Sequence, residues 1–328
     1  MSKKQPKKKH RTENEHFVPQ LYLRGFTNPS GQMFCYDKAN AKSYSTSTKA
    51  AAQEPYFYEI PPTPELHVPI NSVENALGAI ERAWKPMLAE LIESSDTGQI
   101  SARQVNTFAP FVVIQWMRTP TFRAVGYEIM KQFGQSLVDQ LVYLNDPEMV
   151  GKIKFCLEQK GMAGVHAEKL FEQAKVEKMA RDLARHLWVI GINNTEHVFY
   201  TSDHPVVRRG NQHVNGRPLI GANDPGIEFA FPLDSHHILL ILERTHFAVC
   251  SQFDRRSVTL PPEMIQDYNA LQILCSNQRI YCANDDFDLA RNVCTTHPEI
   301  CDPKRPRVVV ETTPIINMSS QTWVRVLE

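Results

Sequence analysis

The chain has 328 residues, enough to bury a substantial core in one large domain or in two closely packed ones. Hydrophobic residues make up 42% and charged residues 22%, a balance that argues against extensive disorder. The net charge is zero, but six basic residues precede the first acidic one, Glu13. The remaining 30 basic residues face 36 acidic ones, so the body carries about −6 and its composition does not imply a broadly basic nucleic-acid-binding face.

The sequence predicts a cytoplasmic protein. Its basic start runs into polar residues with no apolar segment behind them, so no signal peptide is expected. No apolar run approaches the roughly 20 residues that a membrane span needs. The seven cysteines are irregularly spaced, which is typical of reduced thiols rather than of a disulfide framework.

The N-terminal part of the chain combines a polar tail with short elements. Residues 1–14 are rich in lysine and poor in apolar residues, and we expect a disordered basic tail. Pro19 suits the first turn of a short helix through Arg24, which Gly25 would end. Strands are predicted at 33–36, 43–48 and 56–60, followed by a proline-rich loop.

The middle of the chain is predicted to be helical. Ser72 is a candidate N-cap of a helix whose apolar residues repeat at spacings of four, three and four. Ser101 can cap a second helix to about Met117, and Pro120 would break or kink it. Further helices are predicted at 121–145, 148–160 and 163–187.

From residue 188 onward the pattern is typical of strands. They are predicted at 188–192, 197–201, 228–231, 237–242, 247–251, 279–282 and 307–311, with one helix near 262–274. Strands at both ends around a helical block indicate an α+β fold, in which the N-terminal strands join a C-terminal mixed or antiparallel sheet. The predicted organisation is one domain over 15–285 and a C-terminal extension, 286–328, packed on it.

The sequence carries none of the motifs that identify the commonest enzyme classes. It has no G-x-G-x-x-G, no Walker A motif, no H-E-x-x-H and no G-x-S-x-G.

A family resemblance rests on four segments. The stretch from Glu15 to Phe26, which reads E-H-F-V-P-Q-L-Y-L-R-G-F, resembles the opening of domain-of-unknown-function family 4238. Segments 73–81, 115–123 and 199–205 are similar to the rest of that family's pattern, although the family more often has Asn at the position of His204. The resemblance spans roughly 15–285 and implies an architecture but no activity.

The opening segment supplies the first candidate site residues. His16 could serve as a general base or bind an anion, and Gln20 and Arg24, four residues apart, would share one helix face. The structural alternative is that His16 and Gln20 hydrogen-bond buried backbone and hold the N-terminal segment in place.

Thr201, Ser202 and Asp203 place three oxygen-bearing side chains at a strand end, where catalytic groups are common. Asp203 could bind a divalent cation or orient His16. Alternatively, it bonds the local backbone in an Asx-turn before Pro205.

Arg118 and Arg123 flank the helix break at Pro120. Either could clamp a phosphate or carboxylate with its planar guanidinium. Equally, an arginine here could pair with Glu74 or Glu81, which lie seven residues apart on one helix face, in a buried structural ion pair.

Three further patterns are weaker signals. Arg181 and His186 have the R-x4-H spacing of helical metal-independent ribonucleases, but five positions leave them roughly 140° apart on a helix. The lysine-rich residues 3–11 could contact nucleic acid at low salt. A zinc site could be formed by Cys282, Cys294, His297 and Cys301, although their gaps lack a paired knuckle.

The combined hypothesis is that His16, Arg118 and Asp203 form a catalytic set, with Gln20, Arg24, Glu81, Arg123 and Ser202 as binding residues. Glu81 and Asp203 would hold Mg²⁺ or Mn²⁺. This set favours a nuclease-like hydrolase of phosphodiesters or other anionic substrates, possible in mobile-element or phage conflict. The alternatives are a non-catalytic module that binds a ligand, a nucleic acid or a protein, and a purely structural polar framework.

Overall fold

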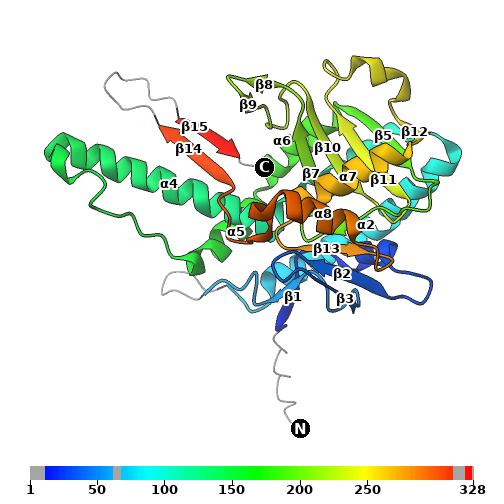
Figure 1. The fold of residues 1–328 in the computed structure, drawn as a ribbon, viewed down its shortest axis with the longest axis horizontal. Helices are drawn as coiled ribbons and strands as arrows, with labels where there is room; N and C mark the ends of the chain where they lie inside the picture. The colour runs from blue at the N-terminus through cyan, green and yellow to red at the C-terminus, as the bar shows by residue number, and fades with distance from the viewer. Residues whose placement is uncertain (1–11, 62–67, 313–321, 327–328) are drawn as a thin grey trace, which may run out of the picture.

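The chain folds around two sheets and a helical block, as the computed structural model shows for residues 12–61, 68–312 and 322–326 (Figure 1). The predicted α+β class is confirmed. The basic residues expected to contact nucleic acid, 3–11, lie outside the described residues. Within the described part, no helix is long and apolar enough to cross a membrane.

The smaller sheet joins the two ends of the chain. It is antiparallel and has the strand order β3–β2–β13–β6. Its strands are β3 (Lys42–Thr46), β2 (Met33–Asp37), β13 (Arg279–Cys282) and β6 (Thr201–Ser202). Because β2 pairs with β13, with Cys35 opposite Tyr281, the prediction that N-terminal strands join C-terminal ones is confirmed.

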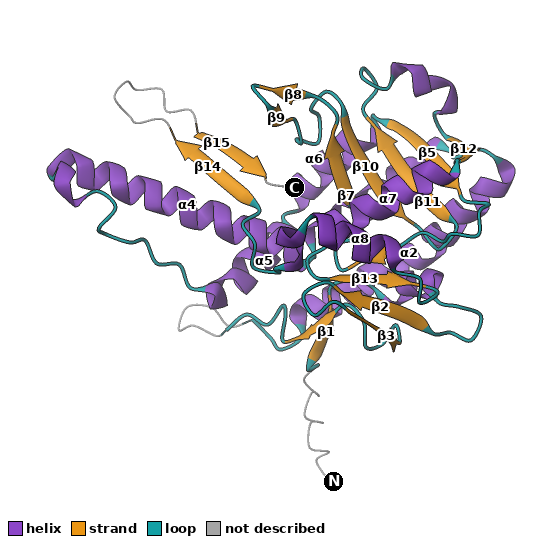
Figure 2. Cartoon of the chain, viewed as in Figure 1, coloured by secondary structure: helices purple, strands orange, loops and turns teal. Residues whose placement is uncertain are grey.

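The larger sheet is mixed, with the order β12–β5–β11–β10–β7. Its strands are β12 (Arg256–Thr259), β5 (Leu187–Ile192), β11 (His237–Leu242), β10 (Ile227–Pro232) and β7 (Val207–Gly210). The three central strands are almost wholly buried and read as continuous apolar runs, because both faces of the sheet are covered. In Figure 2, α7 (Pro262–Cys275) crosses the viewer's side of these strands.

The helical block follows the predicted boundaries in part, since the single helix predicted at 163–187 is two helices separated at Glu172. Its helices are α2 (Ser72–Thr97), α3 (Ala102–Met117), α4 (Pro120–Asn145), α5 (Met162–Phe171) and α6 (Gln173–Ala184). Ser101 caps α3 in a reciprocal capping box with Gln104, as its position predicts. The N-cap of α2 is Asn71 rather than Ser72.

Short elements connect these parts. They are β1 (Asn14–His16) paired with β4 (Gln53–Pro55), α1 (Gln20–Leu23), η1 (Arg24–Phe26), η2 (Pro147–Met149), η3 (Gln159–Gly161), β8 (His213–Val214), β9 (Arg217–Pro218), η4 (Ala248–Phe253), α8 (Asp288–Thr296), η5 (Pro298–Cys301), β14 (Val308–Thr312) and β15 (Thr322–Val326). The outer half of α4 projects from the body beside the β14–β15 hairpin (Figure 1).

Gly25 has a different role from the one predicted. The chain continues past it as the 3₁₀ turn η1, so the glycine does not end the helical segment. A Cβ on Gly25 would lie 2.8 Å from the Cβ of Asp234, and the Gly25 carbonyl accepts the N–H of Ser235 at 3.0 Å. The glycine therefore allows close approach of two backbones.

Four predicted elements are wrong for identifiable reasons. The strand predicted at 197–201 begins only at Thr201, because the N–H groups of Phe199 and Tyr200 donate to Ser235 and to the side chain of Asn269 instead of to a strand. The predicted strand at 56–60 is a turn, because Tyr56 has a φ of 54° and the N–H of Tyr58 donates to the Glu15 carboxylate. The predicted helix at 148–160 is mostly irregular, because Gly151 has a φ of 75° and donates its N–H to Asp139 of α4. Residues 247–251 form part of η4 instead of a strand, after Glu243 accepts two nearby N–H groups.

Candidate functional site

The break between α3 and α4 is built by the R-T-P sequence. Arg118 is the C-cap of α3, Thr119 is the N-cap of α4, and Pro120 takes the first helical position. The Thr119 hydroxyl accepts the N–H of Phe122 and lies 2.7 Å from Nδ1 of His204. The three residues thus turn the chain between two helices and tie it to the T-S-D-H-P segment.

Arg118 is a buried structural cation. Nη1 donates to Oε1 of Glu81 at 2.7 Å, and Nη2 donates to the carbonyl of His16 at 2.6 Å. The Tyr58 hydroxyl donates to the Arg118 carbonyl at 2.6 Å. Burial alone would lower the pKa of Arg118, but nearby Tyr58 and Glu81 outweigh it and raise this pKa. Arg118 therefore pairs with Glu81, as the structural alternative predicts, and contacts His16 only through the backbone carbonyl of that residue.

A second carboxylate, Glu74, lies beside this ion pair. Burial raises the pKa of Glu74 to about 7, while nearby Arg118 opposes the shift and Glu81 adds to it. His16 itself is half-buried, and its Nε2 lies 3.1 Å from the carbonyl of Lys49. Desolvation lowers the pKa of His16.

Asp203 organises the turn before β13. Its two carboxylate oxygens accept the backbone N–H groups of three consecutive residues, Asn277 at 2.7 Å and Gln278 and Arg279 at 2.8 Å. Burial raises the pKa of Asp203, and these three bonds oppose that rise. The backbone-binding alternative thus matches the geometry, with the difference that the bonded backbone is distant in sequence rather than local.

The other polar residues of the T-S-D-H-P segment also form hydrogen bonds within the fold. The Thr201 hydroxyl lies 2.7 Å from that of Tyr22, and the Ser202 hydroxyl donates to Gln272 at 2.8 Å. Burial lowers the pKa of His204 to about 3, so this imidazole is neutral beside Thr119. We call these linked residues the motif framework: His16, Tyr22, Glu81, Arg118, Thr119, Thr201, Ser202, Asp203 and His204.

The structure brings the four family segments together, but as mutual hydrogen-bonding partners. No group of three or more His, Cys, Asp or Glu side chains in the described ranges is arranged to hold a metal ion. The carboxylates of Glu81 and Asp203, which the sequence suggested as metal ligands, have other partners. Glu81 pairs with Arg118, and Asp203 accepts backbone N–H groups of residues 277–279. Gln20 is half-buried at the start of α1, and Arg24 is exposed.

A groove of about 840 Å³ lies next to the framework, between α4, the β4 region and the C-terminal segment 303–307. Of the residues singled out in the sequence, Arg123 alone lines it. The side chains that matter for its chemistry are Glu54, Arg123, Tyr127, Lys131, Asn277 and Lys304.

Arg123 is held in the groove wall without an anionic partner. Its guanidinium carbon lies 3.6 Å from the ring centroid of Phe57, and its Nε donates to Nδ1 of His166 at 2.9 Å. His166 donates from Nε2 to the Met117 carbonyl, and burial lowers its pKa to about 3, so it is a neutral acceptor. Nη2 of Arg123 is buried and has no acceptor.

The charge of the groove follows from its free cations. Among the described residues, Arg123, Lys131 and Lys304 form no ion pair. Desolvation lowers the pKa of Arg123 to about 10, so it stays protonated at neutral pH. Glu54 also lines the groove, where desolvation raises its pKa and Arg123 opposes the rise. Glu128 and Arg307 also line the groove, 4.0 Å apart, so four cationic side chains face two carboxylates and the groove is net positive.

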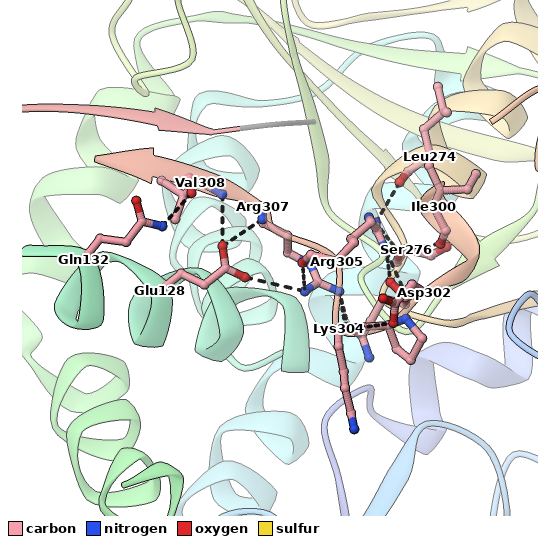
Figure 3. A network of polar contacts seen from close by, with 12 residues as sticks. Glu128, Gln132, Leu274, Ser276, Ile300, Asp302, Lys304, Arg305, Arg307 and Val308 are labelled. Atoms are coloured by element: carbon pink, nitrogen blue, oxygen red, sulfur yellow. Dashed lines mark hydrogen bonds and ion pairs between the residues drawn. The ribbon is translucent and has the colours of Figure 1, made fainter. Parts of the chain in front are cut away.

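One wall of the groove is docked onto α4 by a polar network (Figure 3). Glu128 accepts the backbone N–H groups of Arg307 and Val308, and Gln132 donates to the Val308 carbonyl at 2.8 Å. Arg305 donates to the carbonyls of Leu274 and Ser276 at the end of α7. Lys304 extends away from this network, which leaves its ammonium group available to the groove.

Two other sequence candidates do not form sites. Arg181 is exposed and pairs with Glu177 on α6, whereas His186 is buried with Nε2 2.7 Å from the Ala222 carbonyl. The four candidate zinc ligands do not converge: Cys294 contacts Cys301, but the Cys282 thiol donates to Asn284 and His297 is exposed beside Glu299. All four lie in the described part of the chain, where no metal-binding group is present.

Sequence reasoning missed most of the groove. Tyr127 and Lys131 follow Arg123 at intervals of four, a spacing that places all three on one helix face. That spacing was a usable signal once α4 was predicted. Glu54, Asn277 and Lys304 carry no local signal, because they reach the groove only through tertiary contacts.

The fold and this groove define an α+β protein with a cationic groove beside a buried polar framework. The chain belongs to the DUF4238 family, described as protein of unknown function, whose model matches residues 14–286. Its C-terminal groove wall, 303–307, lies beyond the matched range. A search of curated proteins and a search of solved structures each found no match.

Proposed function

We propose that the groove binds an anionic ligand bearing phosphate groups. The observation that carries this proposal is Arg123, a half-buried guanidinium that packs on the Phe57 ring, donates to a neutral imidazole and forms no ion pair with a described residue. A desolvated cation without a counter-charge costs free energy, and an incoming anion would recover that cost. Its planar donors suit the tetrahedral oxygens of phosphate.

The experiment is calorimetric titration of the full chain with inorganic pyrophosphate. Arg123→Gln should weaken binding by about tenfold or more, since a hydrogen bond to a charged group contributes roughly 1.5–3 kcal/mol. The matched control is Arg181→Gln, which removes an exposed arginine outside the groove and should bind as the wild type does. Absence of pyrophosphate binding by the wild type, or equal binding by Arg123→Gln, would overturn the proposal.

A second candidate function is hydrolysis of a phosphodiester bound in the same groove. Glu54 supports it, because this carboxyl lines the groove with Arg123 and desolvation raises its pKa. In this step Glu54 takes a proton from a water molecule whose oxygen attacks phosphorus. The bond from phosphorus to the leaving oxygen breaks, and that oxygen takes a proton from solvent.

Hydrolysis is tested with bis-p-nitrophenyl phosphate as substrate. Glu54→Gln should abolish release of p-nitrophenol while its affinity for pyrophosphate stays within about threefold of the wild type. A wild-type chain that binds pyrophosphate and releases no p-nitrophenol would make the groove a binding site only.

A further inference from the structure

We infer that the phosphate-bearing ligand of the groove is a single-stranded nucleic acid, with phosphates on the cations and a base stacked on Tyr127; this inference rests on the proposed function. Its basis is the order of side chains along α4. Arg123, Tyr127 and Lys131 follow one another at intervals of four residues and line the same groove. At 1.5 Å per residue the two cations are about 12 Å apart along the helix axis.

Tyr127 is suited to act as a stacking platform between them. Its hydroxyl donates to the carbonyl of Leu157 at 3.1 Å, which fixes the orientation of the ring. The ammonium of Lys131 lies 6.0 Å from the ring centroid, so an aromatic face and a cation are adjacent in the groove wall. Proteins bind single strands by this alternation of cations with aromatic rings, because the backbone needs positive charge and each base has an apolar face.

The opposite wall of the groove supplies a further cation for a phosphate and an amide for a base. Lys304 supplies a third cation from the C-terminal segment, beyond the residues that match the family. Asn277 lines the groove and accepts a hydrogen bond from Arg307 through Oδ1 at 2.6 Å, which leaves the donor side of its amide for a ligand. An amide opposite an aromatic ring can bond the edge of a stacked base. A simple inorganic anion would contact the cations alone, whereas a nucleotide would also contact the ring of Tyr127 and the amide of Asn277.

The test is fluorescence anisotropy of a labelled ten-nucleotide oligo(dT) with the full chain at fixed salt. Tyr127→Leu should weaken binding about fivefold or more, because stacking contributes roughly 1–3 kcal/mol per base, and Tyr127→Phe should retain it. Tyr143→Leu is the matched control, since Tyr143 is exposed on the same helix and does not line the groove. Lys131→Gln should also weaken binding, and Lys85→Gln, an exposed lysine on α2, should not.

The outcomes separate this inference from the proposed function. If Arg123→Gln weakens both pyrophosphate and oligo(dT) while Tyr127→Leu weakens neither, the groove is an anion site and the nucleic-acid inference is wrong. If pyrophosphate does not bind, or binds without regard to Arg123, the proposed function fails first. Oligo(dT) binding that survives every groove variant would place nucleic acid elsewhere on the chain and overturn the inference as well.

Discussion

Arg118 and Arg123 stand five residues apart on either side of one helix break, and their surroundings differ. Arg118 is wholly buried, and both of its terminal nitrogens are engaged, by Glu81 and by the His16 carbonyl. Arg123 is half-buried, packs on Phe57 and bonds only the neutral His166. Nearby Tyr58 and Glu81 raise the pKa of Arg118 despite its burial, whereas desolvation lowers that of Arg123.

The difference distinguishes two uses of the same residue type. In the motif framework, the charged groups of Arg118 and Asp203 bond partners within the fold, so these interactions specify geometry and need no ligand. In the groove, Arg123 forms no ion pair with any described residue, although the carboxylates of Glu54 and Glu15 act on it at longer range, and such a group is a candidate for binding. The recognisable sequence motifs belong to the first region, and the proposed function belongs to the second.

The most direct way to break this comparison is to replace each arginine by methionine. Arg118→Met should cost about 3–5 kcal/mol of unfolding free energy, because Glu81 would be left without its partner. Arg123→Met should cost only about 1–2 kcal/mol, since it removes a cation without an ion pair and keeps the contact with Phe57, but leaves Nδ1 of His166 without its donor. Urea unfolding followed by circular dichroism measures both.

A double variant guards against a chain that fails to fold. Arg118→Met combined with Glu81→Met removes both charges and should recover part of the loss, because no uncompensated carboxylate remains. Equal costs for the two single arginine variants would contradict the division into framework and groove.

The framework also predicts a pH dependence. His204 has a pKa of about 3 in the fold, against about 6.5 when unfolded, because burial disfavours its charged form. Below pH 6.5 the unfolded chain binds the extra proton, so this contribution to stability is complete above pH 6.5 and is lost as the pH falls. The loss should reach about 1.4 kcal/mol per pH unit.

His204→Asn isolates this contribution, because an amide can still bond Thr119 but does not titrate. The slope of stability against pH between 6.5 and 5 should be shallower in the variant than in the wild type. A control at His213, which is exposed on β8, should leave the slope unchanged. Parallel slopes for wild type and His204→Asn would show that His204 is already protonated in the fold.

The smallest expected effect is at Glu74, on the edge of the framework. Its pKa is raised to about 7 in the fold from a usual value near 4.5, so the unfolded chain loses the proton first as the pH rises. Native stability therefore declines from pH 4.5 to 7. Glu74→Gln should gain about 1 kcal/mol at pH 8 and nothing at pH 4, a figure reduced for the partial exposure of this side chain.

The control is Glu93→Gln, which removes an exposed carboxylate from the same helix and should have little effect at either pH. If Glu74→Gln destabilises the chain at pH 8, the carboxylate contributes to the ion pair with Arg118 and belongs within the framework.

Much of the fold could be predicted because the determining signals are local. The capping box at Ser101, the helix break at Pro120 and the apolar runs of β5, β10 and β11 each depend on neighbouring residues. The wrong predictions, at 56–60 and 148–160, share a cause: distant side chains, Glu15 and Asp139, accept the backbone N–H groups there. Local propensity carries no information about such partners.

The candidate site, like the fold, has features that local sequence predicts and features that only distant contacts decide. The sequence by itself determined which residues were chemically notable, including Arg118, Arg123 and Asp203, and that α4 would carry a face with Arg123 and Tyr127. Only the tertiary structure decided that Asp203 would be saturated by the backbone of 277–279 and that Arg123 would lack a counter-charge. The physical reason is that the role of a charged group depends on which partners burial brings to it, and those partners come from segments far away in the chain.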